Sequence, residues 1–482
     1  MTNKDNGPEN PKQSDNAINR GDGIAKKSHN IDIETESQRQ KRRLIISLAW
    51  PSLAENFLTS LMSMFDMMMV GGLGAYAIAA VGLVTQPKFI MMAAFMAMNI
   101  GTTALVARCK GARDRDGANS AFLQSIIITV SLTVVLCTAM IFLSDSLIRW
   151  IAGNEISEQT ITAGITYLKI QVYGFPTMSV TMAINAALRG SGNTRAAFYN
   201  NTVANIVNVF LNYCLIGGRL GFPRLEVTGA SIATVIGQLV GLLLAIYTVT
   251  GGRQYLSLSL KNRVRLNFPM MKRIINIGIP ALLEQVVMRA GMLWFAKIVT
   301  SLGDVSYAAH MVAMNIQQLS FTTGMAFGAA ATTLVGQSLG RKRPDLAKVY
   351  VKMTQNLGYL VSSTIALLLF FGGKVLSGLY SDDILIIGLA AAMLKIVAVS
   401  NPVMNARFVY ASALRGAGDS RYMVLISFIG VLLVRPLGSL ILLNVFGMGL
   451  SGVWIALVLD SAVCFIMALL RYKKGKWVSI II

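Results

Sequence analysis

Long apolar runs alternate with short polar turns along nearly the whole chain. A helix that crosses the hydrocarbon of a bilayer needs roughly 20 predominantly apolar residues, and the pattern predicts twelve such helices. Their predicted spans are 44–71, 77–106, 119–144, 160–188, 196–217, 228–250, 272–301, 306–336, 347–372, 384–413, 421–445 and 450–470. The fold class that follows is an all-α polytopic membrane protein with 12 transmembrane helices.

A nine-residue segment occurs twice, each time between two apolar runs. ALRGSGNTR at 187–195 returns as ALRGAGDSR at 413–421, and Pro51 likewise corresponds to Pro280. Repeats in soluble proteins have much shorter periods, of about 20–50 residues. Six helices in each half, an even number, leave both halves with the same orientation. The duplication therefore predicts two six-helix bundles related by a pseudo-twofold axis along the membrane normal.

The longest polar connection lies between the sixth and seventh apolar runs, and the first 40 residues are too polar to supply a packed core. These features predict five parts along the chain. They are a disordered cytoplasmic tail at 1–43, an N-lobe at 44–252, a cytoplasmic linker at 253–271, a C-lobe at 272–472 and a C-terminal tail at 473–482.

Composition agrees with a membrane protein. Hydrophobic residues make up 54% of the chain and charged residues 13%, against about 25% charged residues in a typical soluble domain. A net charge of +21 can indicate nucleic-acid binding, but the Lys and Arg residues lie in short clusters between apolar runs, which excludes it. Loops on one side of the membrane carry nearly all of these clusters. The positive-inside rule then places both termini in the cytoplasm, with the protein in the cell membrane.

Asp66 is the first candidate for chemistry, because it has apolar neighbours on both sides in SMFDMMMVGGLG. A charge in hydrocarbon is costly, so an intramembrane acid is by default a functional residue. Such a carboxylate can exchange a proton or a sodium ion for a conformational preference. The alternative is a carboxylate held permanently by a Lys or Asn on a neighbouring helix.

An asparagine stripe is the second candidate. Asn205, Asn208 and Asn212 fall at i, i+3 and i+7, which places them on one helical face. Amide side chains can hydrogen-bond across helices or line a wet cavity. Both a structural role and a site remain open for them.

Two prolines within apolar runs, Pro51 and Pro280, are candidate hinges because proline removes a backbone hydrogen bond. Glu55 and Glu284 follow them by one turn. Glu55 is expected to lie at the headgroups. Glu284 has either that role or a place in a substrate or second ion site, since Arg289 follows on the same helix.

The remaining candidates are of three kinds. Methionine thioethers suit varied apolar ligands, and Met67 and Met288 join Asn205, Glu284 and Arg289 as candidates for a substrate site. The repeated RGxG segments predict tight turns, with the arginines bonding to helix C-terminal carbonyls. These turn residues are Arg189, Gly190, Arg415 and Gly416. Asp460 and Arg407 are unassigned charges that can pair.

In combination these motifs resemble the multidrug and toxic compound extrusion (MATE) family, in its bacterial NorM-like and DinF-like branches. The resemblance rests on FDMMMVGGLGAYAIAAVG in the first helix, the duplicated ALRGxGxxR, and GASIAT and GVWIAL in the sixth and twelfth helices. It covers residues 44 to about 472. Members are antiporters that expel organic cations and other amphipathic drugs while Na⁺ or H⁺ enters.

The resemblance implies roles for four residues of the N-lobe. Asp66 matches the first-helix aspartate that couples ion entry to export. Asn208 and Asn212 match an Asn and an Asp on the fifth helix of the DinF-like branch, so an amide replaces the second carboxylate. Thr234 matches a polar partner on the sixth helix.

The C-lobe departs from the NorM-like branch, which uses a Glu on the seventh helix and an Asp on the tenth. Glu284 lies about one turn early, and Met404 and Asn405 stand where the Asp would fall. A sodium site of that type is therefore in doubt here.

The function that the sequence favours is a secondary active multidrug antiporter working by alternating access. Its partners would be small amphipathic or cationic drugs, H⁺ or Na⁺ and membrane lipids, with no nucleic acid, and the protein is expected to be a monomer. No cofactor beyond the transported ion, no structural metal and no catalytic residue is expected. The alternative is a lipid or oligosaccharide-lipid flippase, for which Arg289, Arg407 and Arg435 leave room. A membrane enzyme is disfavoured because the chain has two histidines and no HExxH motif.

Overall fold

The structure is a computed structural model that describes residues 37–153, 156–251, 254–257 and 266–480. Most of the predicted N-terminal tail, residues 253 and 258–265 of the predicted linker, and residues 481–482 lie outside the described residues. The chain divides into a short unit that ends at Leu44 and a second unit, Ile45–Ile482. The architecture below is that of the second unit.

The described chain is almost entirely helical and contains twelve long helical segments. The first six are α1 (Gln38–Gly71), α2 (Ala75–Gly111), α3 (Arg115–Ala152), α4 (Glu158–Gly190), α5 (Thr194–Gly217) and α6 (Glu226–Thr250). The others are α7 (Phe268–Thr300), α8 (Asp304–Gly340), α9 (Pro344–Gly378), α10 (Ile384–Gly416), the segment formed by α11 (Ser420–Ser427), η3 (Phe428–Val434) and α12 (Arg435–Asn444), and α13 (Gly449–Lys473). A short 3₁₀ turn, η4 (Lys476–Ser479), follows.

The twelve predicted helices are confirmed, but several are longer than their apolar runs. α3, for example, extends beyond the predicted 119–144 at both ends, because hydropathy reports only the part of a helix in hydrocarbon. Ten of the described segments are long and apolar enough to cross a membrane. α4 and α5 fall outside that group, and in α5 the asparagines lower the hydropathy.

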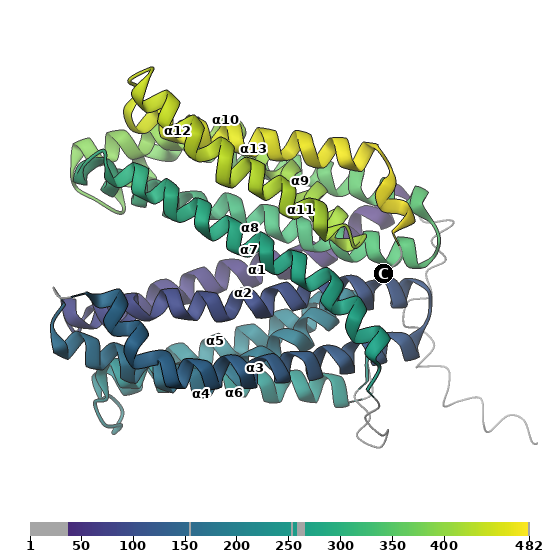
Figure 1. Ribbon diagram of the computed structural model, residues 1–482, viewed down its shortest axis with the longest axis horizontal. Coiled ribbons are helices and arrows are strands. Elements are labelled where there is room, and N and C mark those ends of the chain that lie inside the picture. Colours follow the sequence, from purple (N-terminus) through teal and green to yellow (C-terminus); the bar gives the residue numbers. More distant parts are fainter. Residues whose placement is uncertain (1–36, 154–155, 252–253, 258–265, 481–482) are drawn as a thin grey trace, which may run out of the picture. The chain divides into compact units, whose positions relative to one another are not determined.

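The helices form two lobes (Figure 1). The N-lobe contains α1–α6 and the C-lobe contains α7–α13. In the N-lobe, α4 packs against α2, α3 and α6, and α5 packs against α6. In the C-lobe, α10 packs against α8, α9 and α13. Contact between the lobes runs mainly through α2, which packs against α7 and α8. The expected fold, two six-helix bundles, is therefore what the structure contains.

The duplicated segment makes the same turn in both lobes. α4 ends at Gly190, and Gly192 adopts a positive φ of +84° before Asn193 caps α5 by accepting from the backbone N–H of Ala196 at 3.2 Å. In the C-lobe, Gly418 has a φ of +91° at the equivalent place. A glycine reaches this conformation without the steric cost that a Cβ would add. The expected tight turns are thus present.

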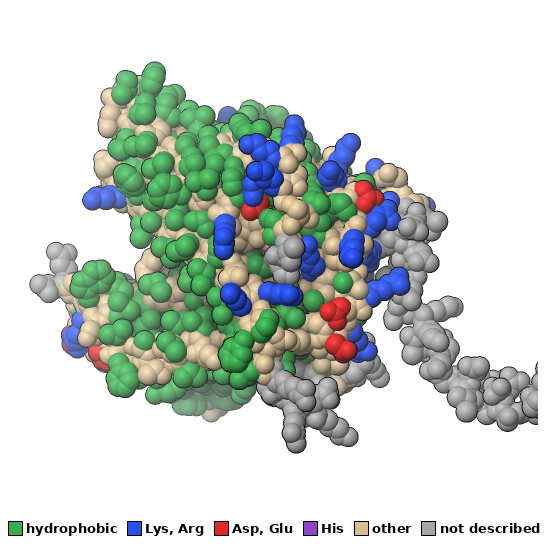
Figure 2. Space-filling model, turned by 45° about the vertical axis from the view of Figure 1, so that its right-hand side comes forward, with side chains coloured by type: hydrophobic (Ala, Val, Ile, Leu, Met, Phe, Trp, Pro, Cys, Tyr) green, Lys and Arg blue, Asp and Glu red, His purple; other side chains and the backbone are tan. Residues whose placement is uncertain are grey.

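Both turns lie at one end of the helices, together with the turns at 112–114 and 341–343. We call this the basic end, because the Lys and Arg side chains gather on one part of the surface while the opposite part is mainly hydrophobic (Figure 2). Glycines let the two lobes meet there. A Cβ on Gly111 of α2 would lie 2.0 Å from the carbonyl oxygen of Gln337, and one on Gly340 of α8 would lie 2.0 Å from that of Arg108.

Side chains add to the junction between the lobes at the basic end. Gln337 Nε2 donates to the carbonyl of Gly190 at 3.2 Å, and Thr333 Oγ1 donates to that of Arg189 at 3.1 Å. The described contacts therefore close the space between the lobes at the basic end.

The eleventh predicted helix, 421–445, contains a feature that hydropathy did not indicate. Its middle is π-helical over Phe428–Val434, where the Arg435 N–H donates to the carbonyl of Gly430 five residues back. Pro436 follows directly, and a proline has no N–H and blocks a carbonyl one turn earlier. The wider turn brings Gly430 so close to α13 that a Cβ there would lie 2.1 Å from the Cys464 sulfur. Such π-bulges often lie at functional sites.

Candidate functional site

Asp66 lies at the centre of a polar cluster between α1, α5 and α6. Asn212 Nδ2 donates to Asp66 Oδ1 at 2.7 Å. The Asn208 amide can be oriented so that both its nitrogen and its oxygen are hydrogen-bonded. In that orientation the nitrogen donates to both Asp66 oxygens at 3.3 Å, and the oxygen accepts from Thr234 Oγ1 at 3.2 Å. The four residues that the resemblance joined, Asp66, Asn208, Asn212 and Thr234, are therefore neighbours in space.

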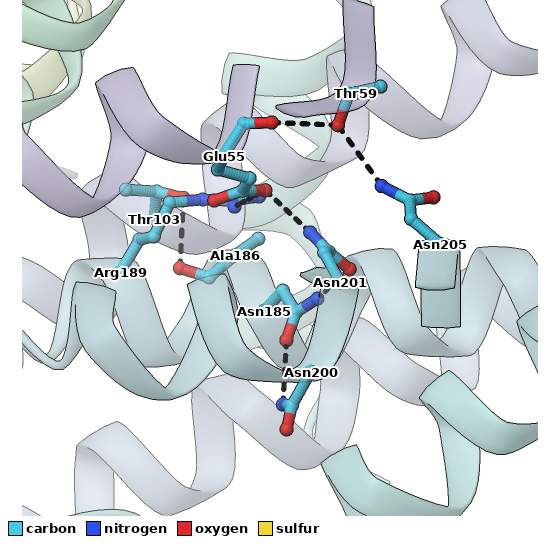
Figure 3. Close-up of polar contacts among 9 residues, drawn as sticks. All are labelled: Glu55, Thr59, Thr103, Asn185, Ala186, Arg189, Asn200, Asn201 and Asn205. Atoms are coloured by element: carbon cyan, nitrogen blue, oxygen red, sulfur yellow. Dashed lines mark hydrogen bonds and ion pairs between the residues drawn. The ribbon is translucent and has the colours of Figure 1, made fainter. Parts of the chain in front are cut away.

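The same face of α5 continues to a second carboxylate (Figure 3). Asn205 Nδ2 donates to Thr59 Oγ1 at 3.3 Å, and Asn201 Nδ2 donates to Glu55 Oε1. Arg189, from the duplicated turn, donates to the same Glu55 oxygen at 3.2 Å. Glu55 is thus a carboxylate paired between helices, and its expected position near the headgroups stays a prediction.

These contacts join α1 to α5 at a constant separation of 146 residues. The constant separation means that the two helices run in the same direction and stay in register from Glu55 to Asp66. Asparagines spaced by three or four residues stay on one face of α5, and that face is turned to α1. The stripe therefore links the two carboxylates of α1 along one side of the helix.

Asn201 extends the network deeper into the N-lobe. Its Oδ1 accepts from Asn185 at 2.9 Å, and Asn185 in turn accepts from Asn200 at 3.1 Å (Figure 3). Buried amides in a membrane protein hydrogen-bond to one another where water is absent. The chain of amides ties α4 and α5 to α1 through Glu55.

The C-lobe repeats the arginine–glutamate pair. Arg415, the counterpart of Arg189, forms an ion pair with Glu284, its Nε lying 3.3 Å from Oε2. Ser427 adds a hydrogen bond to Glu284 at 3.4 Å, and Glu284 is only 2% exposed. The expectation that Arg189 and Arg415 bond to helix C-terminal carbonyls is wrong. Arg189 bonds to Glu55 and Arg415 bonds to Glu284 instead, because a carboxylate in a low dielectric is stabilised by a charged hydrogen-bond donor.

A second ionic cluster lies deeper in the C-lobe. Asp460 of α13 is fully buried and forms ion pairs with both Arg407 of α10, at 3.3 Å, and Arg435 of α12. The π-helical turn before Arg435 directs that residue toward α13. The expected pairing of Asp460 with Arg407 is confirmed, and Arg435 is a third member that the sequence did not indicate.

Asp66 differs from these three carboxylates because no arginine lies within ion-pair distance of it in the described chain. Within the described chain it forms no ion pair, and its hydrogen bonds come from amides. Lys88 of α2 and Tyr167 of α4 interact with it electrostatically at longer range. Asn212 Oδ1, beside it, is buried and accepts no hydrogen bond from the described residues. Asp66 and Asn212 can together offer oxygen atoms to a small cation.

The proposed substrate candidates do not gather at one point. Asn205 belongs to the α5 stripe, Glu284 pairs with Arg415, and the Arg289 guanidinium lies 3.8 Å from the ring centroid of Phe89. Met67 is exposed and Met288 is half-buried. No described hydrogen bond or ion pair joins these candidates to one another. Arg289, Arg407 and Arg435 are all engaged, which weakens the flippase alternative that depended on them.

Sequence reasoning missed several members of the network. Asn201 stands four residues before Asn205, so the helical spacing could have included it. Lys88 is a charge inside the apolar run QPKFIMM, which is a signal for an intramembrane function. Arg435 is also a charge inside an apolar run, but its pairing with Asp460 had no local signal, because the two residues are 25 positions apart.

Comparison with known proteins agrees with this architecture. The MatE family model matches residues 51–214 and 280–440. A protein named Probable multidrug resistance protein NorM, from Thermotoga maritima, is 29% identical over 436 residues, covering 90% of this chain and 93% of the relative. Multidrug resistance protein MdtK of Edwardsiella ictaluri is 26% identical over 448 residues, covering 90% and 95%.

A solved structure described as the outward-facing conformation of a multidrug resistance MATE family transporter of the MOP superfamily has a TM-score of 0.84. It is 22% identical and covers 90% of this chain and 96% of that one, a likeness that supports the fold. Since the family model spans equivalent segments of both lobes and more than half of the chain, this protein belongs to the MatE family.

Proposed function

We propose that this protein is a secondary active exporter that expels amphipathic or cationic drugs in exchange for H⁺ or Na⁺. The family and the relatives named for multidrug resistance support a drug substrate. We further propose that Asp66, Asn208, Asn212 and Thr234 form the ion-coupling site.

The observation that carries the proposal is the difference in partners among four acids that lie within the helices. Glu55, Glu284 and Asp460 each have an arginine within ion-pair distance, whereas Asp66 has amide partners. A carboxylate inside a membrane protein is costly when it is uncompensated. Asp66 is therefore the acid that gains most from a mobile cation, either H⁺ or Na⁺.

The closed basic end suggests where this state stands in a transport cycle. We propose that the basic end faces the cytoplasm, with both termini and the linker there, so that a drug leaves on the opposite side. Binding of the cation at Asp66 would change the contacts between α1 and α5, and α1 would bend near Pro51. The opposite state would load drug from the cytoplasm or the inner leaflet. Exchange requires that the ion and the drug prefer different states.

The test measures efflux from proteoliposomes that contain a fluorescent cationic drug such as ethidium. Wild type is compared with Asp66→Asn, which keeps the shape of the side chain and removes its charge. Asp304→Asn, at an exposed residue in the first turn of α8, makes the same chemical change outside the cluster. The pH and sodium gradients are imposed separately.

We expect gradient-driven efflux with wild type and Asp304→Asn and its loss with Asp66→Asn, because an amide at position 66 can neither release a proton nor supply the negative charge that holds a sodium ion. The gradient that drives efflux by wild type identifies the coupling ion. Equal efflux by Asp66→Asn and wild type would remove Asp66 from the mechanism, and no gradient dependence in wild type would exclude exchange.

A further inference from the structure

A cavity of ≈ 420 Å³ lies between α9, α10 and α13, outside the polar network described above. α10 packs against both of the other helices (Figure 1). Its lining includes Lys348, Lys352 and Gln355 from α9, Tyr410 from α10 and Tyr472 from α13. The three helices therefore bring two ammonium groups, an amide and aromatic hydroxyls to one hollow.

Two polar groups in the lining have no partner among the described residues. Gln355 is 3% exposed, yet neither its Nε2 nor its Oε1 makes a hydrogen bond. The buried hydroxyl of Tyr472 is also without a partner. Buried polar groups are nearly always hydrogen-bonded, so an amide and a hydroxyl left in this way are groups that a ligand can satisfy.

The charge of the hollow has one sign. Lys348 and Lys352 are one turn apart on the exposed face of α9, and neither forms an ion pair within the described chain. No Asp or Glu occurs among the described residues that line the cavity. Two unneutralised ammonium groups with an amide and a hydroxyl behind them suit an anion that carries several oxygen atoms.

The position along the helices matches the boundary between hydrocarbon and water. Lys348 lies one turn inside the start of α9, Tyr410 lies near the end of α10, and Tyr472 is the residue before the last of α13. α9 has 35 residues and is about 52 Å long, so it extends well beyond a hydrocarbon core of about 30 Å. Tyrosine and lysine are characteristic of this interfacial depth.

The chain after α13 holds Tyr472 in place. Trp477 Nε1 donates to the Tyr472 carbonyl at 2.9 Å. The two rings stack with centroids 5.0 Å apart and an interplanar angle of 11°. Tyr410 packs edge-on against the other side of this pair, 5.1 Å from Tyr472. Contacts within the protein therefore fix the aromatic side of the cavity.

We propose that this cavity binds the phosphate headgroup of an anionic phospholipid, such as phosphatidylglycerol. Lys348 and Lys352 contact the phosphate, and Gln355 and Tyr472 hydrogen-bond to the headgroup oxygens. The acyl chains lie along the apolar outer surface of the C-lobe. Basic hollows between membrane helices are known to bind anionic headgroups.

The experiment uses full-length protein in nanodiscs that contain phosphatidylglycerol and phosphatidylcholine in equal amounts. Native mass spectrometry after release counts the phospholipids retained by wild type, by Lys348→Gln/Lys352→Gln and by Lys348→Arg/Lys352→Arg. The matched control, Lys297→Gln/Lys374→Gln, removes two exposed lysines elsewhere. Gel filtration and circular dichroism check that every variant is folded. A parallel arm adds millimolar inorganic phosphate to nanodiscs of phosphatidylcholine alone.

Wild type, the arginine variant and the control are expected to retain phosphatidylglycerol in preference to phosphatidylcholine. Each lysine near a membrane surface contributes about one factor of five in affinity, so the glutamine variant is expected to bind about 30-fold more weakly. Equal retention by the glutamine variant and wild type would overturn the proposal. An equal loss of phosphatidylglycerol in the control Lys297→Gln/Lys374→Gln would also overturn the proposal. Saturation of the site by inorganic phosphate alone would overturn it as well.

Discussion

The glycine contacts between the lobes make a sharp prediction about the conformational equilibrium. Substituting Gly340 or Gly111 by alanine places a Cβ 2.0 Å from a backbone carbonyl oxygen, whereas real Cβ atoms essentially never come within 3.0 Å. The neighbour is backbone, so the lobes themselves must separate by about 1 Å. Overpacking of this kind costs about 1–3 kcal/mol. That cost falls only on the state in which the basic end is closed.

A ligand or substitution that penalises one of two states shifts their ratio by the differential free energy. A penalty of about 1–3 kcal/mol corresponds to about 5–150-fold. We therefore expect both alanine variants to increase the population that is open at the basic end. Spin labels at Asp116 and Asp345, exposed residues in equivalent first turns of α3 and α9, report the separation of the lobes by pulsed dipolar spectroscopy.

The labels are placed in a background in which the four native cysteines are replaced. Wild type should give mainly the shorter distance, and Gly340→Ala and Gly111→Ala should each add a longer component. Gly82→Ala is the matched control, because a Cβ at Gly82 in α2 meets nothing within 4 Å. If both alanine variants give the distance distribution of Gly82→Ala, the glycine contacts do not determine which state is populated.

Two further predictions concern the buried ion pairs. Asp460→Asn leaves Arg407 and Arg435 without a counter-charge and should cost about 3–5 kcal/mol of stability. This loss is measured as a lower unfolding temperature in detergent. An unfolding temperature equal to that of Asp304→Asn would contradict the prediction. Arg189→Gln should destabilise the protein more than the double variant Glu55→Gln/Arg189→Gln does, because the double variant leaves no unpaired charge. Strictly additive losses of stability in the same assay would show that the two residues are not coupled.

The sequence predicted the candidate site only in part. The Asp66 cluster was predictable because an acid in an apolar run is unusual and because the asparagines share one face of α5. The role of the repeated arginines was not, since Arg189 is separated from Glu55 by 134 residues and Arg415 from Glu284 by 131. Local pattern indicated a turn, which is correct, but carried no information about the carboxylate beyond it.

The eleventh helix shows a similar limit. Pro436 signalled a disturbance, but whether proline produces a kink, a break or a π-helical turn depends on what packs against it. Here Gly430 approaches Cys464 closely and Arg435 reaches Asp460, and both contacts involve α13. Only the packed lobe could decide between those outcomes.

By itself, the sequence determined the helical class, the number of helices and the duplication of six. The reason is that hydrocarbon imposes the same length and apolarity on each segment separately, so every span can be recognised without its neighbours. The tertiary structure decided which charges are neutralised and which is left for a mobile cation. Pairing depends on distances of a few ångströms between residues far apart in the chain. Among Glu55, Asp66, Glu284 and Asp460, it leaves Asp66 without an arginine partner in the described chain.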